Sequence, residues 1–383
     1  MIDTDLMLYV HIPFCVRKCA YCDFLSAPAG DAVREQYVEE LCREIADYKG
    51  KAGHRPVSSV FFGGGTPSLL TGEQMSRILD TIRNCFTLTE DAEISMEMNP
   101  GTVTMENLVQ YKAAGVGRIS IGLQSMQEEE LSLLGRIHDA HTFLECYEMA
   151  RKAGFSNINV DLMMGLPGQK REALADTLKK VTDLSPEHIS LYSLILEEHT
   201  PLYETYADSD KLLSQEEDRA LYHMAVAMLE EKGYHQYEIS NFAKEGFFCR
   251  HNEGYWRRRP YLSFGIGAAS FFEEVRWNNT SSLSDYLAGD HAPADQEILT
   301  LKDAMEEFMF LGLRTTAGIC RETFEEAFEE DYETVYGEVT RKLIAQGLLQ
   351  EREEGGKHFV SCTGEGLDLN NLVGGAFLLE DGE

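Results

Sequence analysis

The chain has 383 residues, 43% apolar and 26% charged, which are ordinary values for one large globular domain with a smaller one. Its 34 Lys and Arg residues against 65 Asp and Glu residues give a formal net charge of −31. This charge repels nucleic-acid phosphates and anionic lipid, so we expect no nucleic-acid partner. No apolar run approaches the ~20 residues of a membrane span, so we expect no transmembrane segment.

The N-terminus and the cysteines bear on the compartment. The first residues, MIDTDLMLYVHIP, are acidic and lead into a strand-like run, which argues against a signal peptide. The nine cysteines are odd in number and scattered, as is usual in a reducing compartment. We therefore expect a cytoplasmic protein.

Short β-rich runs alternate with helical patterns over the first 240 residues. Gly115, Gly154 and Gly233 follow helical patterns and fit the C-cap habit of glycine. Strands are expected at 6–12, 58–64, 93–99, 118–124, 157–163 and 188–196, and helices near 31–49, 72–85, 104–114, 140–153, 170–183 and 215–232. Six such βα units imply parallel strands, arranged as an open sheet or a barrel.

The remaining sequence divides into two further parts. Residues 241–296 contain a His-aromatic run and then a polar, turn-rich stretch at 277–296 that is typical of a linker. Residues 297–383 predict an amphipathic helix at 301–318, two helices within 321–350, and a short β element with another helix. Helices followed by a small β element suggest a winged-helix-like domain. Its acidic composition argues against DNA binding.

Three cysteines stand in one short loop after the first expected strand. Cys15, Cys19 and Cys22 have the spacing C-x3-C-x2-C. A cubic iron–sulfur cluster has four iron corners and is bound by cysteine thiolates, so three ligands leave one iron open. A structural zinc site would need a fourth protein ligand. The spacing favours the open cluster, with zinc or inert thiols as the alternatives.

Further motifs extend this pattern into a family resemblance. The runs HIPFC, FFGGGTPS (61–68), SIGLQS (120–125), LGRIH (134–138) and NVDLMMGLPGQ (159–169) resemble the oxygen-independent coproporphyrinogen III oxidase branch of the radical S-adenosylmethionine (SAM) superfamily. YEISNFA (237–243) and CRHNEGYW (249–256) resemble the HemW family of heme chaperones within that branch. The resemblance implies a partial (β/α)6 barrel and a [4Fe-4S] cluster that binds and cleaves SAM. It also implies a HemN-type C-terminal domain.

The motifs fall at or near the C-terminal ends of five expected strands, which in (β/α) barrels form the active face. The resemblance implies that the glycine run receives the methionine end of SAM. The resemblance also implies that several charged and polar residues nearby match the other SAM-contacting positions of the family. Their chemistry suits SAM, since guanidinium pairs with carboxylate, and carboxylate or amide groups bind ribose hydroxyls. The expected cofactor-binding residues are Tyr9, Gly64, Gly65, Thr66, Glu97, Gln124, Arg136 and Asp161.

The segment 251–256 carries the expected heme site. It matches the HNxxYW signature of the HemW family, which implies heme binding, with His251 as the axial ligand. The next residues, Arg257, Arg258 and Arg259, are either a solvated charge run or partners of the heme propionates.

One departure bears on function. Coproporphyrinogen oxidases of this branch carry a fourth cysteine two positions after the third, where this chain has Phe24. We therefore expect a heme chaperone that hands heme to an acceptor apo-hemoprotein, with no residue assigned a catalytic role and a homodimer possible. The alternatives are oxidative decarboxylation of coproporphyrinogen III and radical chemistry on another tetrapyrrole.

Overall fold

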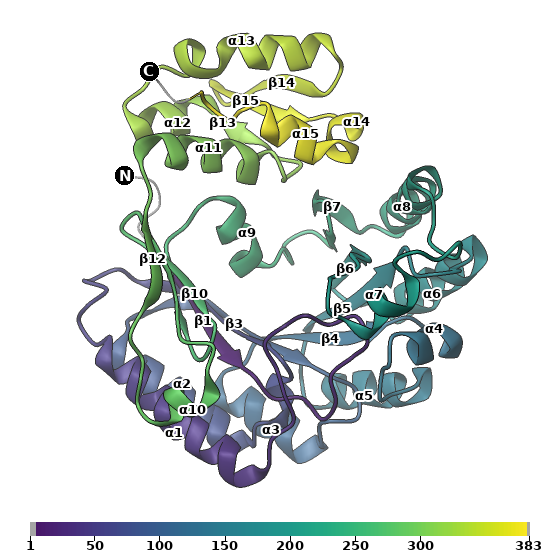
Figure 1. The fold of residues 1–383 in the computed structure, drawn as a ribbon, viewed down its shortest axis with the longest axis vertical. Helices are drawn as coiled ribbons and strands as arrows, with labels where there is room; N and C mark the ends of the chain where they lie inside the picture. Colours follow the sequence, from purple (N-terminus) through teal and green to yellow (C-terminus); the bar gives the residue numbers. More distant parts are fainter. Residues whose placement is uncertain (1–4, 381–383) are drawn as a thin grey trace.

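The computed structural model describes residues 5–380, and its centre is a row of six parallel strands (Figure 1). Most residues of these strands are buried, and the apolar runs that predicted them match strands covered on both faces. The strands are β1 (Leu6–Ile12), β2 (Val57–Gly64), β3 (Leu88–Met98), β4 (Arg118–Gln124), β5 (Asn157–Met164) and β6 (His188–Ser193). All six lie where the sequence predicts a strand.

Shorter strands extend the row at both ends. Beyond β6 lie β8 (Asn241–Ala243) and β7 (His235–Glu238). Beside β1 lie β9 (Tyr261–Phe264), β10 (Ala269–Phe272), β11 (Val275–Asn278) and β12 (Ala294–Ile298). The strand order is β12-β11-β10-β9-β1-β2-β3-β4-β5-β6-β8-β7, and in the described residues the two edge strands do not pair with each other. The sheet therefore curves without closing, which confirms the expected partial barrel.

Helices cover the outer face of the curved sheet (Figure 1). The helices are α1 (Asp31–Asp47), α2 (Gly72–Cys85), α3 (Met105–Ala114), α4 (Glu128–Leu133), α5 (Ala140–Lys152), α6 (Arg171–Asp183), α7 (Pro201–Tyr206) and α8 (Gln215–Glu231). Helices α2 and α8 begin with capping boxes, Thr71 with Gln74 and Ser214 with Glu217. The three glycines expected after α3, α5 and α8 all have positive φ, the left-handed conformation that favours glycine at a helix end.

The stretch 277–296, expected to be a linker, is instead part of the packed structure. It includes the end of β11, the short helix α10 (Leu283–Leu287) and the start of β12. Tyr286 is fully buried, its ring lies 5.0 Å from that of Tyr37, and its hydroxyl donates to Glu44 at 2.6 Å. These contacts order a polar sequence because their partners come from α1, far away in the chain. The limits proposed for the domains stay a prediction.

The C-terminal elements surround their own hydrophobic core, which contains Met309, Phe324 and Tyr336. They are α11 (Leu301–Gly312), β13 (Ile319–Cys320), α12 (Arg321–Phe328), α13 (Tyr332–Ala345), β14 (Leu349–Glu354), β15 (Lys357–Cys362), α14 (Gly364–Asp368) and α15 (Asn370–Gly375). Helices α11, α12 and α13 with the small antiparallel sheet β13-β15-β14 match the winged-helix-like expectation, and two short helices, α14 and α15, follow them. Helix α11 ends at Gly312 rather than at Gly318, because Thr315 binds the Gly312 carbonyl and Thr316 binds the Tyr237 carbonyl.

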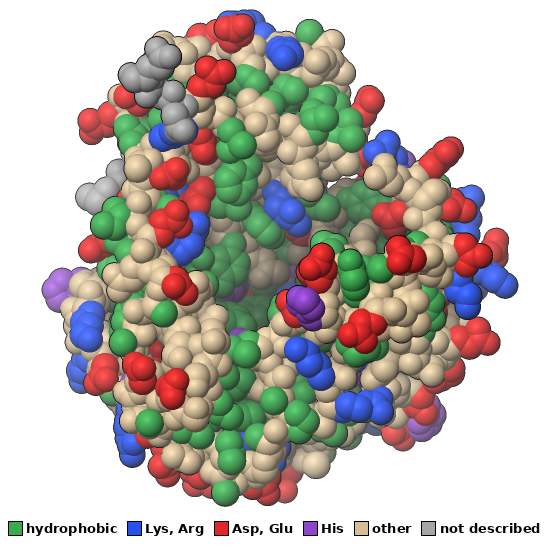
Figure 2. Space-filling view, viewed as in Figure 1, with side chains coloured by type: hydrophobic (Ala, Val, Ile, Leu, Met, Phe, Trp, Pro, Cys, Tyr) green, Lys and Arg blue, Asp and Glu red, His purple; other side chains and the backbone are tan. Residues whose placement is uncertain are grey.

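The surface reflects the composition. Acidic side chains are spread over much of the face shown in Figure 2, and a hollow lined largely by hydrophobic side chains lies near its centre. No helix in the described part of the chain has the length and apolar character that a membrane crossing requires.

Candidate functional site

The three clustered cysteines lie in the loop that follows β1. This loop is fixed at its base, where the Ala27 N–H donates to the Pro13 carbonyl at 2.9 Å and the His11 Nε2 lies 2.9 Å from the Leu25 carbonyl. Its centre is held by Ala20, whose N–H donates to the Leu134 carbonyl at 2.9 Å. All three cysteines, Cys15, Cys19 and Cys22, are partly exposed, and they line one cavity of about 350 Å³. The loop therefore presents all three sulfurs to a common space.

The glycine run after β2 packs directly against this loop. Gly64 has φ of 107°, and a Cβ there would collide with the His11 ring. A Cβ at Gly65 would collide with the backbone of Ile12 and Phe14. Only glycine permits this close approach, which brings the β2 end to the thiol cavity.

A hydroxyl group from the loop after β2 and a guanidinium group from the connection between α4 and α5 reach two of the thiols. Thr66 Oγ1 lies 3.4 Å from Cys15 Sγ, and Arg136 Nη1 lies 3.4 Å from Cys19 Sγ. Arg136 is held by Nη2, which donates to Asn99 Oδ1 and to the Gly122 carbonyl, both at 2.6 Å. These donors give one side of the cavity positive character, which suits thiolates and an anionic ligand group.

Two acidic side chains, Glu97 and Asp161, line the same cavity. Burial raises the pKa of Glu97 to about 8, and repulsion from Asp161 adds to the shift. Burial also raises the pKa of Asp161, against hydrogen bonds from Ser120 at 2.7 Å and Asn159 at 2.8 Å. Glu97 also accepts from the Gly64 N–H at 3.1 Å. The cavity thus combines donors beside the thiols with two acidic side chains that can accept hydrogen bonds.

Gln124 ends β4 in a strained conformation. Its φ is 74°, in the left-handed region that non-glycine residues rarely adopt, and its side chain lines the cavity. Gly122 leaves room beside it, because a Cβ there would crowd Asn99, Gln124 and Arg136. Strain held in place by packing is a frequent mark of ligand sites.

Most residues predicted for the SAM site come together here. The cavity is lined by the three cysteines and by Gly64, Gly65, Thr66, Glu97, Gln124, Arg136 and Asp161. Tyr9 is not among the lining residues. Its hydroxyl lies 3.2 Å from His11 Nδ1 and its ring stacks on Phe61, so it supports the His11 ring from within the barrel.

The sequence reasoning left out several lining residues. Asn99 positions Arg136, and the Asn99-Pro100 pair at the end of β3 was a usable signal. Arg17 donates to the Gly135 carbonyl at 2.8 Å and Tyr192 comes from the end of β6. Neither had a sequence pattern that marked it.

His251 lies at the start of helix α9 (Arg250–Trp256), which packs inside the open barrel. Its Nδ1 is 2.8 Å from Ser59 Oγ, its Nε2 is 3.0 Å from the Tyr255 hydroxyl, and its ring stacks on Phe61. The side chain is 1% exposed, and burial lowers the pKa of His251 to about 3, so the imidazole is neutral. With both ring nitrogens engaged, His251 is not placed to bind iron here. Its role as axial ligand stays a prediction that requires α9 to move.

The three consecutive arginines have different surroundings. Arg257 forms an ion pair with Glu253. Arg258 is 9% exposed and binds Glu274 and, at 2.9 Å, Glu307. The guanidinium of Arg258 is therefore enclosed in ion pairs, and a contact between at least one of the three arginines and a heme propionate stays a prediction.

Comparisons with known proteins agree with this geometry. The family model "Radical SAM superfamily" matches residues 9–181, and "HemN C-terminal domain" matches residues 299–369. The chain is 36% identical to heme chaperone HemW of Bacillus subtilis over 97% of this chain and 99% of the relative. For heme chaperone HemW of Escherichia coli the identity is 42%, over 90% and 97% respectively. The chain belongs to the HemW family.

A solved structure extends the comparison. Coproporphyrinogen III oxidase (HemN) from E. coli, a radical SAM enzyme, superposes with a TM-score of 0.82 at 25% identity, covering 98% of this chain and 90% of that chain. HemW-family membership and this likeness establish the radical SAM fold with its C-terminal domain. Phe24, at the position where the resemblance places the fourth cysteine of the oxidases, lines the thiol cavity and is 67% exposed.

Proposed function

We propose that this protein binds heme and passes it to an apo-hemoprotein. The observation that carries the proposal is its similarity to relatives named heme chaperone HemW, which spans nearly the whole chain. Phe24 supports it as well, because phenylalanine cannot do the work of a thiol. Any reaction that needs a fourth cysteine at this position is therefore unavailable.

The same proposal includes a [4Fe-4S] cluster and SAM at the thiol cavity. Among the described residues, no group of three Cys, His, Asp or Glu side chains converges closely enough to hold one metal ion. That separation disfavours zinc, whose ligands surround a single point, and fits a cluster, in which each thiolate binds a different iron. When bound, the cluster would supply an open iron site and an electron.

The chain's own residues provide the SAM contacts. Gly64 and Gly65 leave backbone surface free of side chains beside the thiols. Arg136 would bind a carboxylate, and its Nε is buried without a hydrogen-bond partner among the described residues. Asp161 and Glu97 would accept hydrogen bonds from ribose hydroxyls. The residues present therefore fit the cofactor in donors, acceptors and available space.

The alternative function is oxidative decarboxylation of coproporphyrinogen III, which the likeness to the E. coli oxidase favours. A direct experiment separates the two. The anaerobically reconstituted, reduced protein is incubated with SAM and coproporphyrinogen III, and separately with hemin. A stable Soret complex with hemin and no vinyl-bearing product supports the chaperone. Vinyl-bearing product with consumption of SAM overturns it.

Two further parts of the proposal concern the setting. We place the protein in the cytoplasm, where reducing conditions keep thiols free and available to a cluster. We also propose that it can form a homodimer, which sedimentation of the hemin-free and hemin-loaded protein tests. Heme and an acceptor apo-hemoprotein are the proposed partners.

A further inference from the structure

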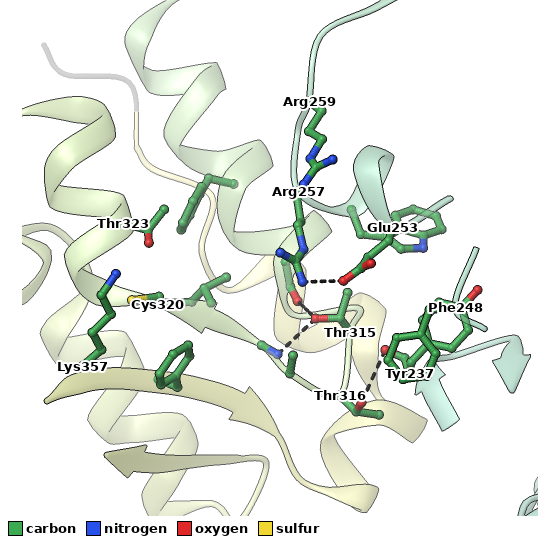
Figure 3. Close-up of a pocket in the computed structure, with 17 residues that line it drawn as sticks. Tyr237, Phe248, Glu253, Arg257, Arg259, Thr315, Thr316, Cys320, Thr323 and Lys357 are labelled. Atoms are coloured by element: carbon green, nitrogen blue, oxygen red, sulfur yellow. Dashed lines mark hydrogen bonds and ion pairs between the residues drawn. The ribbon is translucent and has the colours of Figure 1, made fainter. Parts of the chain in front are cut away.

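A second cavity lies between α9 and the C-terminal elements. It has a volume of about 380 Å³, within the ~300–1,000 Å³ of small-molecule sites, and shares no lining residue with the thiol cavity. One wall comes from α9 and the segment before it, the other from α11, the loop 315–318, β13 and β15 (Figure 3). The second wall includes Ile319 of the C-terminal hydrophobic core and Phe308, which packs against that core.

Aromatic rings form much of this cavity. Tyr237 and Phe248 stack at 4.4 Å between ring centroids, and Trp256, Phe308 and Phe359 complete the set. Phe248 is 37% exposed. Flat aromatic surfaces of this kind suit a flat, largely apolar ligand.

The polar part of the lining is cationic. The lining contains one carboxylate, that of Glu253, and three cations, Arg257, Arg259 and Lys357. This excess of positive charge is notable because the whole chain has a formal net charge of −31. Figure 3 shows Arg257 and Arg259 close together near α9, with Lys357 on the opposite wall. Cations on both walls are placed to pair with more than one carboxylate of the same ligand.

The HNxxYW segment contributes two residues to this cavity, Glu253 from a variable position of the signature and Trp256 from its last position. His251 and Tyr255 bind each other inside the barrel, whereas Trp256 lines the cavity and its indole Nε1 is buried without a hydrogen-bond partner among the described residues. The signature thus anchors α9 with its first part and presents an aromatic ring to the cavity with its last residue.

We infer that this interdomain cavity, rather than His251, forms the heme site. The porphyrin ring packs among the aromatic side chains, and its two propionates pair with the cations. The inference rests on the proposal that the protein carries heme. It deepens that proposal by naming the surface that holds the ligand. A site between α9 and the C-terminal elements also lets the ligand leave toward an acceptor without unfolding the barrel.

Two variants of the full chain test the site by hemin titration at the Soret band. Replacing Arg257, Arg259 and Lys357 by Gln should weaken hemin binding about tenfold or more. The same variant should bind hemin dimethyl ester, which lacks the propionate charges, about as well as wild type. Ala317→Trp should also weaken hemin binding, because residue 317 is exposed and lines the cavity, so a large ring fills space without entering a core.

A matched control removes three exposed cations elsewhere. Lys179→Gln, Lys180→Gln and Lys232→Gln change the net charge equally, on the surface of α6 and at the end of α8, and should leave hemin binding unchanged. If both cavity variants bind hemin as tightly as wild type, the cavity is not the heme site although the chaperone function stands. If wild type itself binds no hemin, the proposed function fails instead.

Discussion

Replacement of His251 tests whether this residue is structural or an iron ligand. His251→Ala removes hydrogen bonds to two hydroxyl groups, those of Ser59 and Tyr255, and the stacking on Phe61. Each buried polar group left unpaired costs about 1–3 kcal/mol, and loss of the ring contact about 0.5–1.5 kcal/mol. These contributions sum to about 2.5–7.5 kcal/mol, and since single substitutions rarely cost more than about 5 kcal/mol, we expect the free energy of unfolding to fall by roughly 2.5–5 kcal/mol.

The assay is urea unfolding followed by circular dichroism, with hemin titration of the folded variant. His251→Gln can keep one hydrogen bond, so it should lose less stability and leave the Soret maximum of the hemin complex unchanged. His141→Ala, on the exposed face of α5, is the control and should change the free energy by less than ~0.5 kcal/mol.

The pH dependence of the same variant follows from the lowered pKa of His251. The folded imidazole titrates near pH 3 and the unfolded one near 6.5, so the unfolded state binds the extra proton between these values. This contribution to stability is present above pH 6.5 and is lost as the pH falls, by up to about 1.4 kcal/mol per pH unit. His251→Gln should remove it. A variant with wild-type unfolding but a displaced Soret maximum would refute the structural role and identify His251 as a ligand.

Three further predictions concern the cluster, SAM and a buried carboxylate. Cys15→Ala, Cys19→Ala or Cys22→Ala should each abolish the oxygen-sensitive brown chromophore, whereas Cys249→Ala, fully buried and outside the thiol cavity, should keep it. Normal iron and sulfide content in a loop variant would contradict the assignment. Arg136→Ala and Asp161→Ala should each weaken SAM binding by about 1.5–3 kcal/mol, roughly one to two decades in affinity, without loss of the cluster. Unchanged SAM titrations of these variants would contradict the assignment of Arg136 and Asp161 as SAM contacts. Burial raises the pKa of Glu44 to about 7 in the folded state, against about 4.5 in the unfolded state. Because the folded state then holds its proton more tightly, the contribution of Glu44 to folding stability is present at low pH and is lost as the pH rises from about 4.5 through 7. The stability advantage of wild type over Glu44→Gln should therefore shrink from pH 5 to pH 8, and a constant difference would contradict this.

The sequence predicted the elements well where local pattern decides them. Parallel strands buried on both faces are short apolar runs, and the helix ends at Gly115 and Gly154 need a positive φ that glycine adopts at no steric cost. The thiol loop was equally visible, because its three ligands are local.

The sequence predicted less where side chains meet across the fold. The stretch 277–296 looked like a linker because Tyr37 and Glu44, which bury Tyr286, lie more than 200 residues away. Tyr9 and His251 have protein partners inside the barrel that the sequence could not reveal, and their ligand contacts stay predictions. The interdomain cavity could not be seen at all, since its aromatic and cationic residues come from segments that only the packing of the two cores brings together.

Heme transfer is the measurement that tests the central claim most directly. The reconstituted protein, loaded with one equivalent of hemin, is mixed with an apo-hemoprotein whose restored absorption or activity reports the arrival of heme. The account predicts transfer, with recovery of the heme-free protein and no change in the porphyrin. Retention of hemin by the loaded protein, or transfer no different from that of free hemin at equal concentration, would contradict it.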